Sequence, residues 1–128
     1  MLAFAQRARN AGARRFAVVS SLGANASSGN FYSRVKGEME AAVATLGFDA
    51  VVIARPSLLD GDRASLGQPM RLGERLALAV TGPFASLIPQ ALRPIKAATV
   101  ARGMLVALQQ ARPGVRIVES AELQQLGA

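Results

Sequence analysis

Two short apolar runs with a helix-length segment between them constrain the fold of this chain most. Residues 15–20 and 50–54 are rich in Val, Ile and Ala, a composition that is typical of buried strands. The residues between them predict a helix over 30–46, which Gly47 would end. A strand, a helix and a second strand in this order favour a parallel pair of strands within an α/β layer fold.

The rest of the chain continues this alternation. Further elements are expected as helices over 1–11, 70–80, 99–111 and 121–126, a strand over 115–118, a loop over 55–69 and a short apolar segment over 84–88. Asn30 or Ser28 would cap the helix over 30–46, and Ser120 would cap the last helix. No apolar stretch reaches 18 residues, so no membrane span is expected.

Tyr32 and Lys36 stand four residues apart on the predicted helix over 30–46. This spacing places a phenol and an ammonium group on one helix face. A nearby cation favours the ionised phenol, so the pair is a candidate for acid–base chemistry. Ser20 and Ser21 end the preceding strand, where a hydroxyl could hold a polar group of a ligand.

Composition excludes several classes of site. The 128 residues contain no Cys and no His, which rules out thiolate chemistry and excludes most zinc sites and catalytic triads. The net charge is +7, from 15 Lys and Arg against 8 Asp and Glu. The basic residues are spread along the chain and are not interleaved with aromatic residues, so nucleic acid is not an expected partner.

Three stretches resemble the catalytic half of an atypical, extended-like short-chain dehydrogenase/reductase, of the Tat-interacting-protein type of NAD(P)-binding oxidoreductase. They are Val18 to Ala24, Phe31 to Glu40 and Phe48 to Leu59. The resemblance implies the C-terminal half of a Rossmann-like doubly wound parallel sheet with a small helical substrate cap. Residues 1–60 would be the catalytic strand–helix–strand part, and residues 61–128 the cap and C-terminal elements.

The glycine-rich dinucleotide fingerprint of that family does not occur in this sequence. The chain is therefore expected to start within the domain, without the N-terminal half that holds the pyrophosphate. On this expectation the chain alone would be inactive and would not hold a dinucleotide tightly.

The resemblance also implies roles for individual residues. Tyr32 would exchange the proton at the substrate oxygen, and Lys36 would lower the pKa of Tyr32 and hold the nicotinamide ribose. Ser21 would orient the substrate, with Ser20 as the alternative that the sequence leaves open. The segment Pro56-Ser57-Leu58 would meet the nicotinamide amide through its backbone.

Two further residues on the predicted helix invite interpretation. Glu40 matches an acidic position of the family or forms a surface ion pair with Lys36, four residues before it. Gly37 disfavours a helix by about 1 kcal/mol relative to Ala, so a neighbouring helix or a dimer partner is expected to approach closely there.

The function that the resemblance implies is hydride transfer between NAD or NADP, with NADP favoured, and a carbonyl or alcohol substrate. The alternative is a non-catalytic module on the same fold that senses a dinucleotide or binds a protein. No metal is expected, and the protein is expected in the cytoplasm. The strand over 15–20 should pair with residues 50–54 on one side and leave its other edge free for self-association.

Overall fold

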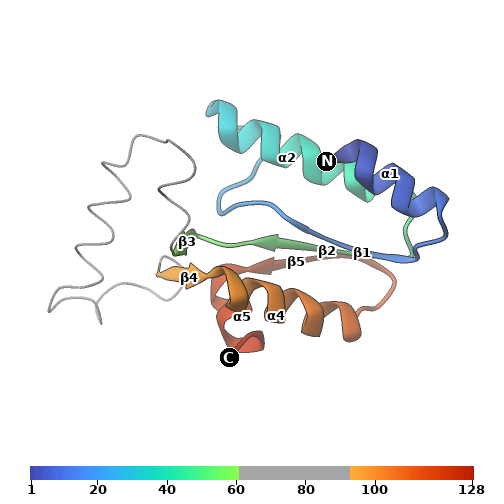
Figure 1. The fold of residues 1–128 in the computed structure, drawn as a ribbon. Helices are drawn as coiled ribbons and strands as arrows, with labels where there is room; N and C mark the ends of the chain where they lie inside the picture. The colour runs from blue at the N-terminus through green and yellow to red at the C-terminus, as the bar shows by residue number, and fades with distance from the viewer. Residues whose placement is uncertain (61–92) are drawn as a thin grey trace, which may run out of the picture.

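The computed structural model describes residues 1–60 and 93–128 and shows an α/β fold (Figure 1). Its centre is a three-stranded parallel sheet of order β1-β2-β5. A second sheet consists of the parallel pair β3-β4. The strands are β1 (Arg15–Val19), β2 (Ala50–Arg55), β3 (Leu58–Asp60), β4 (Pro94–Lys96) and β5 (Gly114–Glu119), and the helices are α1 (Leu2–Asn10), α2 (Phe31–Ala44), α4 (Ala97–Gln109) and α5 (Ser120–Leu126).

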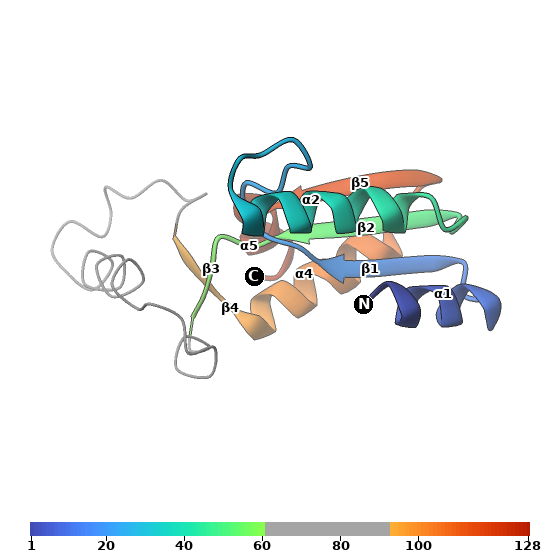
Figure 2. The same ribbon diagram turned by 90° about the horizontal axis from the view of Figure 1, so that it is seen from above.

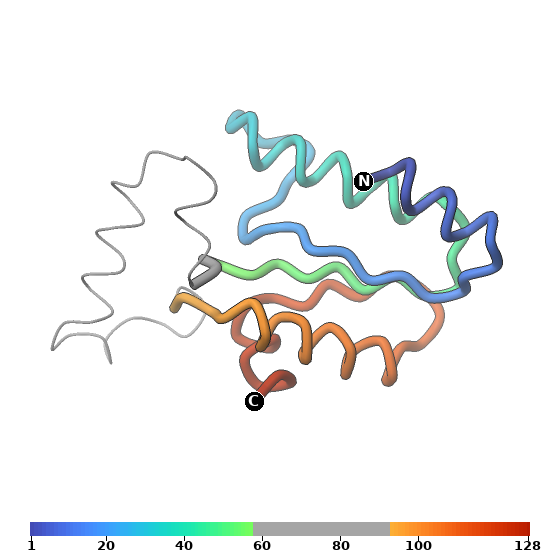
Figure 3. Tube along the Cα trace, in the orientation of Figure 1, coloured from blue at the N-terminus to red at the C-terminus, as the bar shows by residue number. Residues whose placement is uncertain are grey.

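Helices cover both faces of the three-stranded sheet, as two perpendicular views show (Figures 1 and 2). Side chains alternate between the faces of a strand, and β2 is apolar on both. Val51 and Ile53 pack in a cluster with residues of α1 and α2, whereas Val52 and Ala54 pack in a cluster with residues of α4 and α5. The chain trace therefore starts in one helical layer and ends in the other (Figure 3).

The predicted elements agree closely with the observed ones where the sequence periodicity is strong. The helix expected over 30–46 is α2, and the Asn30 side chain accepts a hydrogen bond from the Ser33 amide at 3.2 Å, so Asn30 is its N-cap. Gly47 follows with φ of +89°, a conformation that glycine adopts without strain. The strands expected over 15–20, 50–54 and 115–118 are β1, β2 and β5.

Two predictions about local structure are wrong, and one group lies outside the described residues. Residues 58–60 were expected in a loop, but they form β3, which pairs with the equally unexpected β4. Ser120 does not cap α5, because Glu119 is the N-cap residue and makes no side-chain capping bond. The predictions for 70–80 and 84–88, and the helical substrate cap with them, lie outside the described residues.

The neighbour predicted for β1 is confirmed. β1 pairs with β2 from Arg15↔Ala50 to Val19↔Ala54, and within residues 1–60 and 93–128 no other strand pairs with it. The edge of β1 away from β2 is thus open in the described part of the chain. Among the same residues, no helix is long and apolar enough to cross a membrane.

Candidate functional site

The carboxyl ends of β1 and β2 bring two of the predicted site segments together. Parallel strands end at the same edge of a sheet, and the backbone pairing continues beyond both strands. The Ser20 amide donates to the Ala54 carbonyl at 2.6 Å, and the Leu22 amide donates to the Pro56 carbonyl at 3.1 Å. The segment 20–22 therefore lies directly beside the segment that contains Pro56 and Ser57.

The two serines at the end of β1 carry hydroxyls that have no partner. Both Oγ atoms are buried, and neither makes a hydrogen bond to any of the described residues. A buried hydroxyl without a partner costs about 1–3 kcal/mol, so such groups are uncommon and point to a bound ligand or water. The geometry does not decide between Ser20 and Ser21, because both hydroxyls share this state.

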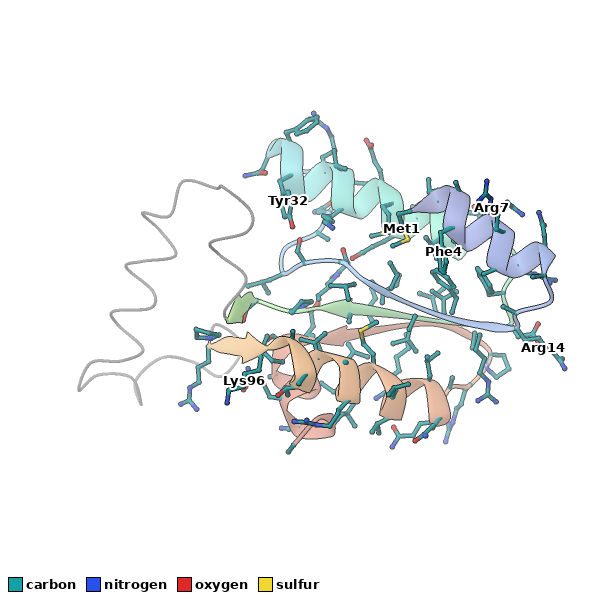
Figure 4. The ribbon with its side chains drawn as sticks, viewed as in Figure 1. Met1, Phe4, Arg7, Arg14, Tyr32 and Lys96 are labelled. Atoms are coloured by element: carbon teal, nitrogen blue, oxygen red, sulfur yellow. The ribbon has the colours of Figure 1, made fainter. Side chains whose placement is uncertain are left out.

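Tyr32 and Lys36 come together on one face of α2, as the spacing predicts. The Lys36 Nζ lies 5.7 Å from the centroid of the Tyr32 ring, so the ammonium faces the ring. Tyr32 is 59% exposed. Figure 4 shows its side chain extending from the first turn of α2 towards the side on which the sheet lies. The pair thus offers a cation and an aromatic ring at the edge where β1 and β2 end.

The Ser57 hydroxyl bonds to other segments. Its Oγ donates to the Arg93 carbonyl at 2.7 Å and lies 3.2 Å from the Ser120 Oγ. These bonds connect the end of β2 to the start of α5 and to the segment before β4. Pro56 is buried and its carbonyl accepts from Leu22, while Leu58 is the first residue of β3. The segment Pro56-Ser57-Leu58 therefore lies at the predicted edge, with the Ser57 side chain already bonded.

A three-residue ion network lies beneath this edge, and the sequence interpretation missed it. Arg55 at the end of β2 donates two hydrogen bonds to the Glu40 carboxylate of α2, Nε to Oε1 at 2.9 Å and Nη2 to Oε2 at 2.7 Å. Its Nη1 donates to Glu119 Oε1 at 3.0 Å. The Glu40 side chain is 9% exposed and the Arg55 side chain 19% exposed. The predicted surface pair of Glu40 with Lys36 is wrong, because the carboxylate turns inward to Arg55.

The network sets the protonation of its members. Burial raises the pKa of Glu40, but the hydrogen bonds from Arg55, the nearby Ser20 hydroxyl and the Arg55 charge outweigh burial and lower the pKa overall. The Ser20 hydroxyl lies close enough to the Glu40 carboxylate to favour its charged form, although it makes no hydrogen bond to the described residues. The hydrogen bond to Glu40 raises the pKa of Arg55 further, against burial, with support from Glu119. Both groups are therefore charged at neutral pH.

Signals for this network exist in the sequence. Glu40 lies three residues after Gly37 and three before Val43, and these three are the buried residues of α2. An acidic residue on the buried face of a helix requires a cation, and Arg55 directly follows the apolar run of β2. Neither signal identifies Arg55 as the partner of Glu40, because residues 40, 55 and 119 come together only in the folded chain.

Gly37 allows a loop to lie against α2. A Cβ at this position would overlap the backbone of Asn25 and Ala26. The Asn25 amide also donates to the Ser33 carbonyl at 2.9 Å. The predicted close approach at Gly37 is confirmed, but the partner is the loop that follows β1 and not a helix or a dimer partner. This contact fixes the path from Ser21 to α2.

The comparisons with known proteins point to one group of fungal relatives. No protein-family model matches the chain. It is 39% identical over 84 residues to "Protein fmp52, mitochondrial" of Aspergillus niger, a match of 66% of this chain and 32% of the relative. It is 36% identical over 112 residues to "Protein FMP52, mitochondrial" of Candida albicans, a match of 87% of this chain and 46% of the relative. A third relative, from Emericella nidulans, is 45% identical over 62 residues.

These names correct several expectations. They denote FMP52 proteins, a family distinct from the short-chain dehydrogenase/reductases, so the expected family is wrong. The predicted hydride transfer and the description as an oxidoreductase are therefore wrong as well. The relatives are named mitochondrial, which contradicts the expected cytoplasmic location. The chain spans less than half of the length of these relatives and is similar to one part of them.

Proposed function

We propose that the edge where β1 and β2 end binds the nicotinamide–ribose half of NAD or NADP. The observation that carries this proposal is the pair of buried serine hydroxyls, Ser20 and Ser21, which lack partners at the carboxyl end of a parallel sheet. Ligands of open α/β sheets bind outside this end of the strands. The proposal concerns binding alone and includes no chemical step.

The residues at this edge fit the chemistry of that ligand half. Nicotinamide carries an amide, and ribose carries two hydroxyls, so both can exchange hydrogen bonds with serine hydroxyls. The Lys36 ammonium can donate to ribose oxygens, and the exposed Tyr32 ring can contact an aromatic ring. The net charge of +7 favours the more anionic NADP over NAD.

The contacts support weak binding by residues 1–128. No glycine-rich phosphate turn of the Rossmann kind occurs in the sequence, so the described edge offers groups for the nicotinamide half but no such turn for the pyrophosphate. A few hydrogen bonds and one ring contact correspond to a dissociation constant on the order of 1 mM, about 4 kcal/mol.

The wider context is part of the same proposal. Helices on both faces of a parallel sheet support a Rossmann-like arrangement for the protein to which this edge belongs. The names of the relatives support a mitochondrial location for this chain. A fluorescent fusion that stays outside mitochondria in a fungal cell would contradict the location without affecting the binding site.

Amide chemical shifts test the site directly. Nicotinamide mononucleotide should shift the amides of residues 20–22 and 32–36 with saturation, whereas adenosine monophosphate should leave them in place. Ser21→Ala and Ser20→Ala should each be compared with Ser27→Ala, an exposed serine of the same loop. Loss of one hydrogen bond should weaken binding by about 3- to 10-fold in the variant that carries the contact.

Two outcomes would contradict the proposal. Absence of shifts at these amides up to about 10 mM, an order of magnitude above the expected constant, would mean that the edge does not bind the nicotinamide half. Equal shifts with adenosine monophosphate would mean that the edge does not select that half.

A further inference from the structure

The amino end of the sheet, opposite the proposed site, carries two adjoining hollows. One has a volume of about 500 Å³ and is lined by residues 110 and 112–116. The other has a volume of about 300 Å³ and is lined by Arg14, Arg15, Asp49, Ala50 and residues 111–113. Arg112 and Pro113 belong to both, so they form the wall that the two hollows share.

Arginines from two distant parts of the chain converge on these hollows. Arg14 and Arg15 lie at the start of β1, Arg112 lies in the connection from α4 to β5, and Arg116 lies on β5. Figure 4 shows Arg14 at the end of the molecule where β1 starts, far from Tyr32. The sequence spreads these residues widely, and only the fold makes them neighbours.

Three of the four guanidinium groups already have partners. Arg14 Nε lies 2.7 Å from Asp49 Oδ2, and Arg116 Nη2 lies 3.1 Å from Glu122 Oε2. Arg15 Nη1 donates to the Leu108 carbonyl at 3.1 Å, near the end of α4. The same carbonyl also accepts from the Ala111 amide at 3.2 Å, so Arg15 adds a second bond to the end of α4.

Arg112 is the exception. It is exposed on the shared wall, and no hydrogen bond or ion pair joins its side chain to any residue in the two described ranges. Its charge therefore has no partner among the described residues.

We infer that Arg112 is the centre of a binding site for the phosphate group of a small soluble ligand. A guanidinium presents two parallel N–H donors that match two phosphate oxygens. Arg15 and Arg116, on either side of Arg112, add positive charge to the two hollows. The site is separate from the proposed nicotinamide edge, because a strand of six residues spans about 20 Å between its ends.

A competing explanation makes a different prediction. α4 ends at Gln109, close to Arg112, and a helix C-terminus favours nearby cations through its dipole. An arginine that serves only this purpose would bind no anion in a saturable way, and its removal would lower helix stability without changing any ligand affinity.

The probe is inorganic phosphate, titrated at low ionic strength into residues 1–128, with chloride as the reference anion. The amides of residues 110–116 should shift and saturate with phosphate. Arg112→Gln should weaken binding at least about tenfold, as expected for loss of a bidentate charged contact. Arg34→Gln is the matched control, since it removes one positive charge from α2, which lies elsewhere in the fold.

The outcomes separate the explanations. Saturable binding that Arg112→Gln weakens and Arg34→Gln leaves unchanged supports the inference. Equal weakening by both variants would overturn it, because the effect would then come from net charge. Absence of saturation would overturn it as well. Binding to phosphatidylglycerol vesicles but not to phosphate or to phosphatidylcholine vesicles would show a membrane surface and would also overturn the soluble ligand.

Discussion

Replacing Arg55 by methionine should destabilise the protein strongly. The change removes three donors and leaves the Glu40 carboxylate, whose side chain is 9% exposed, without its cation. Removing one partner of a buried ion pair costs about 3–5 kcal/mol. Because Arg55 keeps 19% exposure and Glu119 is 47% exposed, we expect the lower end, about 3 kcal/mol. This is a large fraction of the roughly 5–15 kcal/mol that stabilises a typical domain.

The double variant Glu40→Met/Arg55→Met separates the lost charge from lost packing. Replacing both ions with apolar side chains of similar length leaves no buried charge behind, so its free energy of unfolding should lie within about 1 kcal/mol of the original protein. Urea denaturation of the four proteins of this cycle gives the coupling energy between the two residues. The control is Arg14→Met, which breaks the exposed pair with Asp49, with side chains 82% and 53% exposed. That change should cost about 0–1 kcal/mol.

Either of two results would refute this reasoning. If Arg55→Met lowers the free energy of unfolding no more than Arg14→Met does, then water solvates the Glu40 carboxylate well and the loss of its cation carries no desolvation cost. If the double variant is as unstable as Arg55→Met, the loss comes from packing or from Glu119 and not from a stranded carboxylate.

Three further predictions follow from other contacts. The pKa of Glu40 is lowered in the folded state, so its stabilisation is full above the ordinary pKa of a glutamate and is lost as pH falls through the folded pKa. Acid denaturation curves should therefore be flatter for Glu40→Gln than for the original protein. Gly37→Ala should lower the thermal midpoint sharply through overlap with Asn25 and Ala26, whereas Gly29→Ala, with no atom within 4 Å, should leave it nearly unchanged. The open edge of β1 should promote self-association, and a dilute monomer in sedimentation with all amides of residues 16–19 protected from exchange would contradict this.

The sequence predicts the strongly periodic elements well because their local signals agree with their tertiary surroundings. α2 has an N-cap, a helical pattern and a terminal glycine, and β2 has an unbroken apolar run. The sequence did not predict β3 and β4 because each has three residues, too few to show the alternation of apolar and polar side chains that marks a strand. In addition, β4 starts with Pro94, and proline disfavours strands. Their pairing joins residues 58–60 to 94–96, a contact that no local pattern contains.

In the candidate site, too, local contacts were predictable from the sequence and long-range contacts were not. The proximity of Tyr32 and Lys36 follows from helix geometry, and the position of Ser20 and Ser21 follows from the end of a strand. The partners of Arg55, by contrast, lie 15 and 64 positions away in the chain, at Glu40 and Glu119. The sequence resemblance also led to the wrong family, because it rests on a few short stretches, whereas the relatives matched over longer segments are named FMP52 proteins.

The buried position of Glu40 also shows which way the face of α2 that carries Tyr32 and Lys36 is turned. Residues four apart on an α-helix are offset by about 40° around its axis, so Lys36 is turned by about 40° and Tyr32 by about 80° from Glu40. With Glu40 held inward by Arg55, Lys36 should be half-buried and Tyr32 should lie at the border with solvent. The structure shows this gradient, from a buried Glu40 through an intermediate Lys36 to a Tyr32 that is 59% exposed. Helix spacing alone brings the phenol and the ammonium together, and the buried face of Gly37, Glu40 and Val43 fixes the rotation of α2 that orients them.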